Sequence, residues 1–225
     1  MNIHEAIRQR HSVRSYTNMP IEEDKLETLK KLVEICNLRS GLHIQLISND
    51  PKAFDSRLAH YGKFTNINNY FAMIGPDNAV LDEKVGYYGE QLVLKAQMLG
   101  LNTCWVGLTY KKNPEVLDIR SKEKLRCLIA LGHGLNQGVQ HKMKTIDKVS
   151  SVEGEMPEWF KNGVESALLA PTAMNQQQFK FTLKGTNTVE ADPGWGFFSR
   201  VDLGIAMFHF EVGAGKDNFQ WAVKQ

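Results

Sequence analysis

The apolar residues of this chain occur in short segments whose spacing alternates between that of a helix and that of a strand. Leu128 to Leu131 is one of the longest apolar runs, and it is far too short to cross a bilayer. Helical spacing marks residues 3–9, 22–37, 84–99, 157–169 and 201–213, and strand-like runs mark 43–48, 70–74, 103–106, 125–132 and 178–183. This pattern predicts a fold of packed helices and strands.

Glycine and proline mark where these elements end. Gly75-Pro76 stops the strand at 70–74. Gly100 is expected to end the helix at 84–99 as a left-handed cap. We expect a connector over residues 135–157, which are polar and lack strong periodicity. Further expectations are a polar loop at 66–69, a helical turn at 114–119, a Gly/Trp-rich loop at 193–198 and a polar tail.

The second part of the chain repeats the plan of the first. Gly89 and Gly100 are expected to bracket one helix, and Gly204 and Gly215 bracket another at the same interval. Residues 40–45 also align with 172–177, and each block follows an amphipathic helix and precedes a strand. The shared order of elements, more than the weak residue similarity, indicates a decayed internal duplication. We expect a first half over 1–150 and a truncated second copy over 151–225.

Composition excludes several classes of protein. The 225 residues carry a net charge of +2, so no strong field favours nucleic acid or membrane as a partner. The three cysteines are sparse and widely spaced, which suits a reducing compartment better than a disulfide framework. Charged residues near the N-terminus argue against a signal peptide. We expect a cytoplasmic protein without a metal site.

The first candidate site is the run Arg10-His11-Ser12-Val13-Arg14. Alternate residues of this run offer cationic donors and a hydroxyl group, which suits the binding of a phosphate. Taken alone, the run is more simply a solvated basic turn between two helices.

Three further segments contain candidate residues. Residues 94–107 end in Cys104-Trp105-Val106-Gly107, Lys142 and Lys144 lie in the connector, and residues 170–177 read Ala-Pro-Thr-Ala-Met-Asn-Gln-Gln. Each has an ordinary alternative: core packing, solvated lysines, and a proline stop after a helix. We find no Ser-His-Asp set, metal-ligand cluster or P-loop.

Taken together, these four segments resemble the FMN-dependent nitroreductase family. The resemblance covers residues 1–150 well and 157–215 in part. Asn102 stands where that family has the glycine at the third position of a Gly-Leu-Gly turn. The Pro-Thr turn normally follows the first long helix, whereas here it begins near residue 170. The resemblance implies an α+β fold with a central, mostly antiparallel sheet flanked by helices.

The resemblance also implies a role for each candidate residue. Arg10 and Ser12 would bind the FMN phosphate, Arg14 would reach the N1/O2 edge of the flavin, and a backbone N–H at Val106 or Gly107 would donate to N5. Arg14, Val106 and Gly107 are therefore the candidate catalytic residues. The other candidate cofactor-binding residues are His11, Trp105, Lys142, Lys144, Pro171, Thr172, Asn175 and Gln176.

The function implied by the resemblance is an FMN-dependent oxidoreductase. NADH or NADPH would reduce the flavin, and a nitroaromatic, a quinone or a similar electron-poor acceptor would reoxidise it at the same site by a ping-pong mechanism. Two alternatives remain: a flavin-dependent reductase of another substrate, such as a haloaromatic, and an FMN-binding carrier or sensor without turnover.

The position of the Pro-Thr turn predicts how the site is assembled. In relatives this turn comes from the partner subunit of a homodimer. Here the basic run occurs only in the first half and the turn only in the second. We therefore expect a monomeric pseudo-dimer with one complete site, and a homodimer is the competing arrangement.

Overall fold

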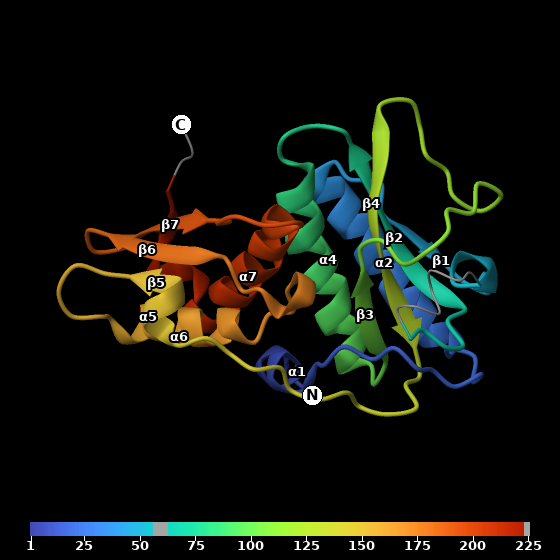
Figure 1. Ribbon diagram of the computed structural model, residues 1–225, viewed down its shortest axis with the longest axis horizontal. Coiled ribbons are helices and arrows are strands. Elements are labelled where there is room, and N and C mark those ends of the chain that lie inside the picture. Colours follow the sequence, from blue (N-terminus) through green and yellow to red (C-terminus); the bar gives the residue numbers. More distant parts are fainter. Residues whose placement is uncertain (56–62, 223–225) are drawn as a thin grey trace.

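The computed structural model describes residues 1–55 and 63–222 (Figure 1). The longer helices are α2 (Glu23–Ser40), α4 (Leu81–Met98), α6 (Glu158–Leu168) and α7 (Ser199–Ala214). The shorter ones are α1 (Ile3–Gln9), α5 (Ile146–Val149), η1 (Pro51–Ala53), η2 (Ala173–Asn175) and η3 (Lys216–Asn218). The strands are β1 (Gln45–Ile47), β2 (Asn69–Pro76), β3 (Asn102–Val106), β4 (Glu123–Gly132), β5 (Ser150–Ser151), β6 (Lys180–Lys184), β7 (Thr188–Asp192) and β8 (Gln220–Trp221).

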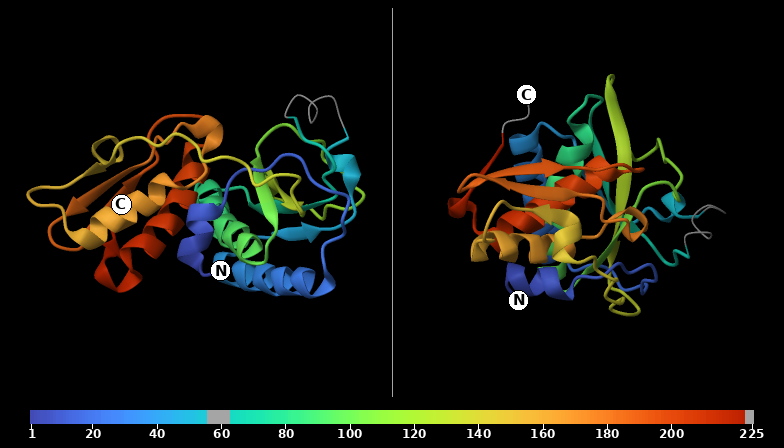
Figure 2. Two further views of the ribbon diagram at one scale, coloured as in Figure 1. Left: turned by 90° about the horizontal axis from the view of Figure 1, so that it is seen from below. Right: turned by 60° about the vertical axis from the view of Figure 1, so that its left-hand side comes forward.

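The first half is built on an antiparallel sheet of order β1-β2-β4-β3. Alternate residues of β2 point to opposite faces, so Phe71 and Met73 pack on one side and Tyr70 and Ala72 on the other. Helices α2 and α4 cover the first of these faces and lie next to each other (Figure 2). The sheet is thus buried on both faces, which explains why its central strands are continuous apolar runs.

The second half is built on a smaller sheet of order β5-β6-β7-β8. Strands β6 and β7 form an antiparallel hairpin, while β5 and β8 add to its edges in parallel. Helices α6 and α7 lie against this sheet, and α7 also lies along α4 between the two sheets (Figure 1). The predicted α+β fold with helices flanking an antiparallel sheet is confirmed.

Two glycines allow α4 and α7 to cross at close range. A methyl group on Gly86 would overlap the carbonyl oxygen of Val201, and one on Gly204 would overlap that of Glu83. The contact is reciprocal, because each glycine faces the residue three positions before the other glycine: Gly86 faces Val201, and Gly204 faces Glu83. The expectation that Gly89 and Gly204 bracket helices is wrong, because both lie inside them.

Other sequence expectations need correction in detail. The helical turn expected at 114–119 is shorter than predicted: it spans residues 114–116, and the backbone N–H of Leu117 donates to the Asn113 carbonyl at 3.2 Å. The connector contains α5 and β5. The hairpin strand β7 and the C-terminal strand β8 were not expected, since both are short and largely polar and take their pairing from neighbouring strands. The left-handed conformation expected of Gly100 after α4 is present, with a φ of 77°.

Candidate active site

A cavity lies where the two halves meet. Its walls come from the segment after α1, from the end of β3, from the turn after α6 and from the start of α7. The lining residues are Ser12, Arg14, Cys104, Trp105, Val106, Gly107, Cys127, Pro171, Thr172, Ala173, Met174, Phe198, Val201, Asp202 and Ile205. Seven of them are predicted site residues, drawn from both halves of the chain.

The segment after α1 reaches the cavity because it pairs with β3. Ser12 forms a parallel bridge with Thr103, and the backbone N–H of Val13 donates to the Thr103 carbonyl at 3.0 Å. Side chains alternate in such an extended segment, so Ser12 and Arg14 share one side while Val13 is buried on the other. Arg14 is the arginine of the predicted run that lines the cavity.

The end of β3 brings backbone close to the same space. Trp105 lines the cavity with its indole packed over Gly89 of α4, where a methyl group would overlap the ring. A methyl group on Gly107 would come within 2.5 Å of the Phe198 ring, so only glycine fits between that ring and the strand end. Phe198 is itself held in a left-handed conformation, with a φ of 63°, beneath the Arg126 guanidinium at 4.1 Å.

The turn after α6 forms the opposite wall. Pro171, Thr172 and Met174 line the cavity, and the Met174 side chain is fully exposed at the surface. Gln177 is the residue that fixes the turn. Its backbone N–H donates to the Thr172 hydroxyl at 3.1 Å, and its buried side-chain amide donates to the Lys142 carbonyl at 2.8 Å.

Asp202 completes this wall and was not predicted. Its carboxylate accepts the backbone N–H of Ala173 at 2.9 Å and the Gln176 side-chain amide at 2.7 Å. Burial raises the pKa of Asp202 to about 6, and these two hydrogen bonds oppose that shift. A single acid within the apolar run Val-Asp-Leu-Gly-Ile-Ala is the signal that could have identified it.

Arg10 lies behind the cavity rather than on its wall. Its side chain is almost fully buried, and its Nε is 3.9 Å from a carboxylate oxygen of Glu90 on α4. That Nε has no hydrogen-bond partner, and burial lowers the pKa of the Arg10 guanidinium. The structure therefore places Arg14 on the cavity wall and Arg10, the residue expected to bind the phosphate, behind it.

Five other predicted residues lie outside the lining. His11 is half-buried, and burial and nearby Arg10 lower its pKa. Lys144 donates from Nζ to the Gln177 carbonyl at 2.8 Å, and Asn175 donates from its side chain to the Lys142 carbonyl at 2.8 Å. These hydrogen bonds attach the connector to the turn. Gln176 reaches the site only through Asp202 and through the carbonyl of Phe197.

A buried polar network connects the halves directly behind Trp105. Glu90 is fully buried; it accepts the indole N–H of Trp105 at 3.0 Å and lies 2.9 Å from Nε2 of His209 on α7. The other ring nitrogen of His209 lies 3.1 Å from the Ser166 carbonyl. Both ring nitrogens face acceptors, so the Glu90–His209 pair must hold two protons between them. Glu90 is thus the link between Trp105, α7 and the nearby Arg10.

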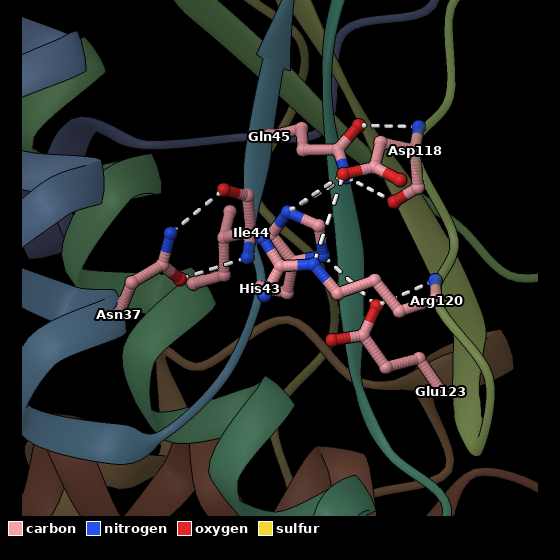
Figure 3. A network of polar contacts seen from close by, with 7 residues as sticks. All are labelled: Asn37, His43, Ile44, Gln45, Asp118, Arg120 and Glu123. Carbon is pink, nitrogen blue, oxygen red and sulfur yellow. Dashed lines mark hydrogen bonds and ion pairs between the residues drawn. The ribbon is translucent and has the colours of Figure 1, made fainter.

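The corresponding turn of the first half has a structural role instead. His43 stands where the second-half turn has an asparagine, and its Nδ1 is 2.9 Å from Glu123 (Figure 3). Asn37 makes two hydrogen bonds to the backbone of Ile44, at 2.7 and 2.9 Å. The backbone N–H of Asp118 donates to the Gln45 side chain, so these groups attach the loop before β4 to β1 (Figure 3).

Comparison with known proteins identifies the family. The family model described as "Putative TM nitroreductase" matches residues 2–214. The chain belongs to the nitroreductase family. No curated protein matches the sequence.

Solved nitroreductase structures share the fold. One from Thermotoga maritima MSB8 matches with a TM-score of 0.66 at 22% identity, covering 96% of this chain and 85% of that one. One from Desulfovibrio desulfuricans, solved with FMN, has a TM-score of 0.54 at 19% identity and covers 70% and 99%. NfrA1 nitroreductase from Bacillus subtilis has a TM-score of 0.52 at 16% identity and covers 65% and 72%.

Residues 1–55 and 63–222 contain neither a metal-binding cluster nor a membrane-spanning helix. No cluster of three or more histidine, cysteine or acidic side chains there is arranged to hold a metal ion. No helix of that part is long and apolar enough to span a membrane. The candidate site is the cavity between the halves, which residues from both halves line.

Proposed function

We propose that this protein is an FMN-dependent NAD(P)H oxidoreductase that reduces nitroaromatics, quinones or similar electron-poor acceptors. One observation carries the proposal. A single cavity brings Arg14 and the Trp105–Gly107 strand end of one half against the Pro171–Thr172 turn of the other. The solved relative from Desulfovibrio desulfuricans contains FMN, which supports the same cofactor here.

The residues present suit a flat, anionic cofactor. The backbone of Val106 and Gly107 lines the cavity where β3 ends, and Arg14 offers a positive charge on the same wall. Behind the wall, the Nε of Arg10 is a buried donor without an acceptor, as expected next to a site that receives negative charge. When bound, FMN would supply the hydride chemistry, and the protein would supply orientation and charge.

The first test is the identity of the flavin. The purified protein should be yellow, and flavin released by heat should run as FMN rather than FAD on chromatography. The chain has no glycine-rich dinucleotide turn of the kind that holds FAD. A colourless protein that does not bind added FMN would rule out this function.

A carrier or sensor that binds FMN without turnover is the second candidate. Anaerobic addition of NADH or NADPH separates the two, because an oxidoreductase bleaches the bound flavin rapidly. A carrier would keep its oxidised spectrum. The choice among nitroaromatic, quinone and haloaromatic acceptors is then made by comparing their rates of reoxidation of the bleached protein.

Replacing Arg14 with alanine should lower the midpoint potential of the bound flavin. Reduction adds negative charge to the ring, and the Arg14 guanidinium on the cavity wall stabilises it. We expect a loss of about 1 kcal/mol, which is about 20 mV for two electrons. Spectroelectrochemical titration measures it. The matched control is Arg39→Ala, which removes an exposed arginine at the end of α2; an equal shift in both variants would contradict the role of Arg14.

We also propose that one chain forms one complete site as a monomer. The order α2-β1-β2-α4 in the first half corresponds to α6-β6-β7-α7 in the second, and the reciprocal contact of Gly86 and Gly204 supports a pseudo-two-fold arrangement. The basic run and the Pro-Thr turn already meet within the chain. The proposal extends to a cytoplasmic, reducing setting, which the three unpaired cysteines suit.

Light scattering on the FMN-loaded protein tests the monomer. We expect the mass of one chain, with FMN retained on dilution. A protein that keeps FMN only as a dimer, and loses it on dissociation, would place the turn of one chain on the site of another. Cutting the chain near residue 150 should release the flavin in either case, so only the dilution series separates the two arrangements.

A further inference from the structure

The Asp202 carboxyl group accepts hydrogen bonds from its protein partners and donates none to them in the described structure. Asp202 is only 4% exposed and lines the cavity. Each protein group that bonds to it in the described structure is a donor: the N–H of Ala173, at 2.9 and 3.1 Å to the two oxygens, and the amide of Gln176 at 2.7 Å. A carboxyl hydroxyl, if present, would therefore find no acceptor among these partners.

The orientation of the Gln176 amide follows from its second contact. The same Nε2 that reaches Asp202 also lies 2.9 Å from the carbonyl oxygen of Phe197. A carbonyl oxygen only accepts, so the amide must present its NH₂ group to this position and cannot be flipped to accept from Asp202. The loop packs tightly here, because a methyl group on Gly196 would come within 2.5 Å of the other amide atom, Oε1.

Within residues 1–55 and 63–222, no lysine, arginine or histidine nitrogen lies within ion-pair distance of the Asp202 carboxylate. The charged and titratable groups around it are Arg14, Cys104 and Cys127 on the cavity wall, Arg126 over the Phe198 ring, and Arg200 on the same helix. Burial favours the neutral form of a carboxyl group, and it raises the pKa of Asp202 to about 6 against the opposing hydrogen bonds from Gln176 and Ala173.

We propose that Asp202 binds the ligand of this cavity as a neutral acid, donating its hydroxyl hydrogen to an acceptor oxygen or nitrogen of that ligand. Binding then takes up one proton whenever the free protein holds Asp202 as a carboxylate. The proposal rests on the proposed function for the nature of the ligand. The acceptor atom belongs either to the flavin ring or to the electron acceptor above it, and the two cases are separable.

The first arm measures the binding of riboflavin to the flavin-free protein between pH 5.5 and 8.5. Riboflavin has no phosphate, so ligand ionisation does not interfere. We expect wild-type affinity to fall by up to about tenfold per pH unit above pH 6, since one proton is taken up. Isothermal titration in buffers of different ionisation enthalpy should count that proton directly.

Two substitutions distinguish the neutral acid from a merely structural side chain. Asp202→Asn keeps an acceptor for Ala173 and offers N–H donors to the cavity, so it should bind riboflavin tightly at every pH. Asp202→Ala removes the donor and should bind weakly at every pH. Asp192→Asn is the matched control, because Asp192 is an exposed acid that also accepts a backbone N–H; it should titrate like the wild type. Urea unfolding midpoints confirm that each variant is folded.

The second arm uses 4-nitrobenzoate with the FMN-loaded protein, followed by the flavin absorbance. If the wild-type affinity falls with pH and that of Asp202→Asn does not, in this arm alone, then Asp202 donates to the electron acceptor. If the same result is seen in the riboflavin arm, Asp202 donates to the flavin. An unchanged pH profile for Asp202→Asn in both arms overturns the proposal, as does wild-type affinity that rises with pH. If no variant binds flavin at any pH, the proposed function fails as well.

Discussion

Replacing Glu90 with alanine should lower the free energy of unfolding by about 3–5 kcal/mol, because removing one member of a buried charged network leaves the others without partners. Glu90 is fully buried, and its carboxylate serves the Trp105 indole, the His209 ring and the nearby Arg10 guanidinium. The substitution would leave two donors and a buried cation uncompensated. Urea unfolding followed by far-UV circular dichroism measures the loss.

Glu90→Gln is the informative counterpart. The glutamine oxygen still accepts from Trp105, and its NH₂ group donates to Nε2 of His209, so most of the stability should return. Glu27→Ala provides a surface control: Glu27 pairs with Lys30 at 2.7 Å but is half exposed, and its loss should have little effect on the free energy of unfolding. Equal losses for Glu90→Ala and Glu27→Ala would show that the buried network contributes little.

The second large effect concerns the crossing of α4 and α7. Gly86→Ala and Gly204→Ala should each destabilise the protein by about 3 kcal/mol, at the upper end of overpacking costs. In both cases the new methyl group overlaps a backbone carbonyl of the facing helix, and a backbone cannot move aside as a side chain can. The helices must separate, which also opens the cavity between the halves. We therefore expect weaker FMN binding in the folded fraction of both variants.

Gly163→Ala is the matched control for these two variants. Gly163 also lies inside a helix, α6, so it gains the same helix propensity on substitution. The three atoms nearest to its new methyl group would be side-chain atoms of Phe210 and Ala214, at 2.8–2.9 Å, and the contact should cost about 1 kcal/mol. If all three variants lose the same stability, close backbone approach is not what holds α4 and α7 together.

The local pattern of the sequence was enough for the main elements. Helices α2, α4, α6 and α7 and the central strands of the first sheet lie where apolar periodicity placed them, within a few residues. Such periodicity reflects which side of a helix or strand is buried, and a buried face is encoded by residues close together in sequence. Apolar periodicity did not predict β7 or β8, because these short strands form by pairing with their neighbours in the second sheet more than by their own composition.

Part of the candidate site was likewise predictable from the sequence, and part was not. The sequence alone determined the family, the segments that form the cavity, and seven of its lining residues, because these motifs are short and continuous. Only the tertiary structure decided that Arg14 faces the cavity while Arg10 turns inward to Glu90, and that Asp202 closes the site. Arg10 and Glu90, like Asp202 and Gln176, are far apart in the chain. Their charge states and hydrogen bonds depend on partners from other elements, which no local spacing of residues encodes.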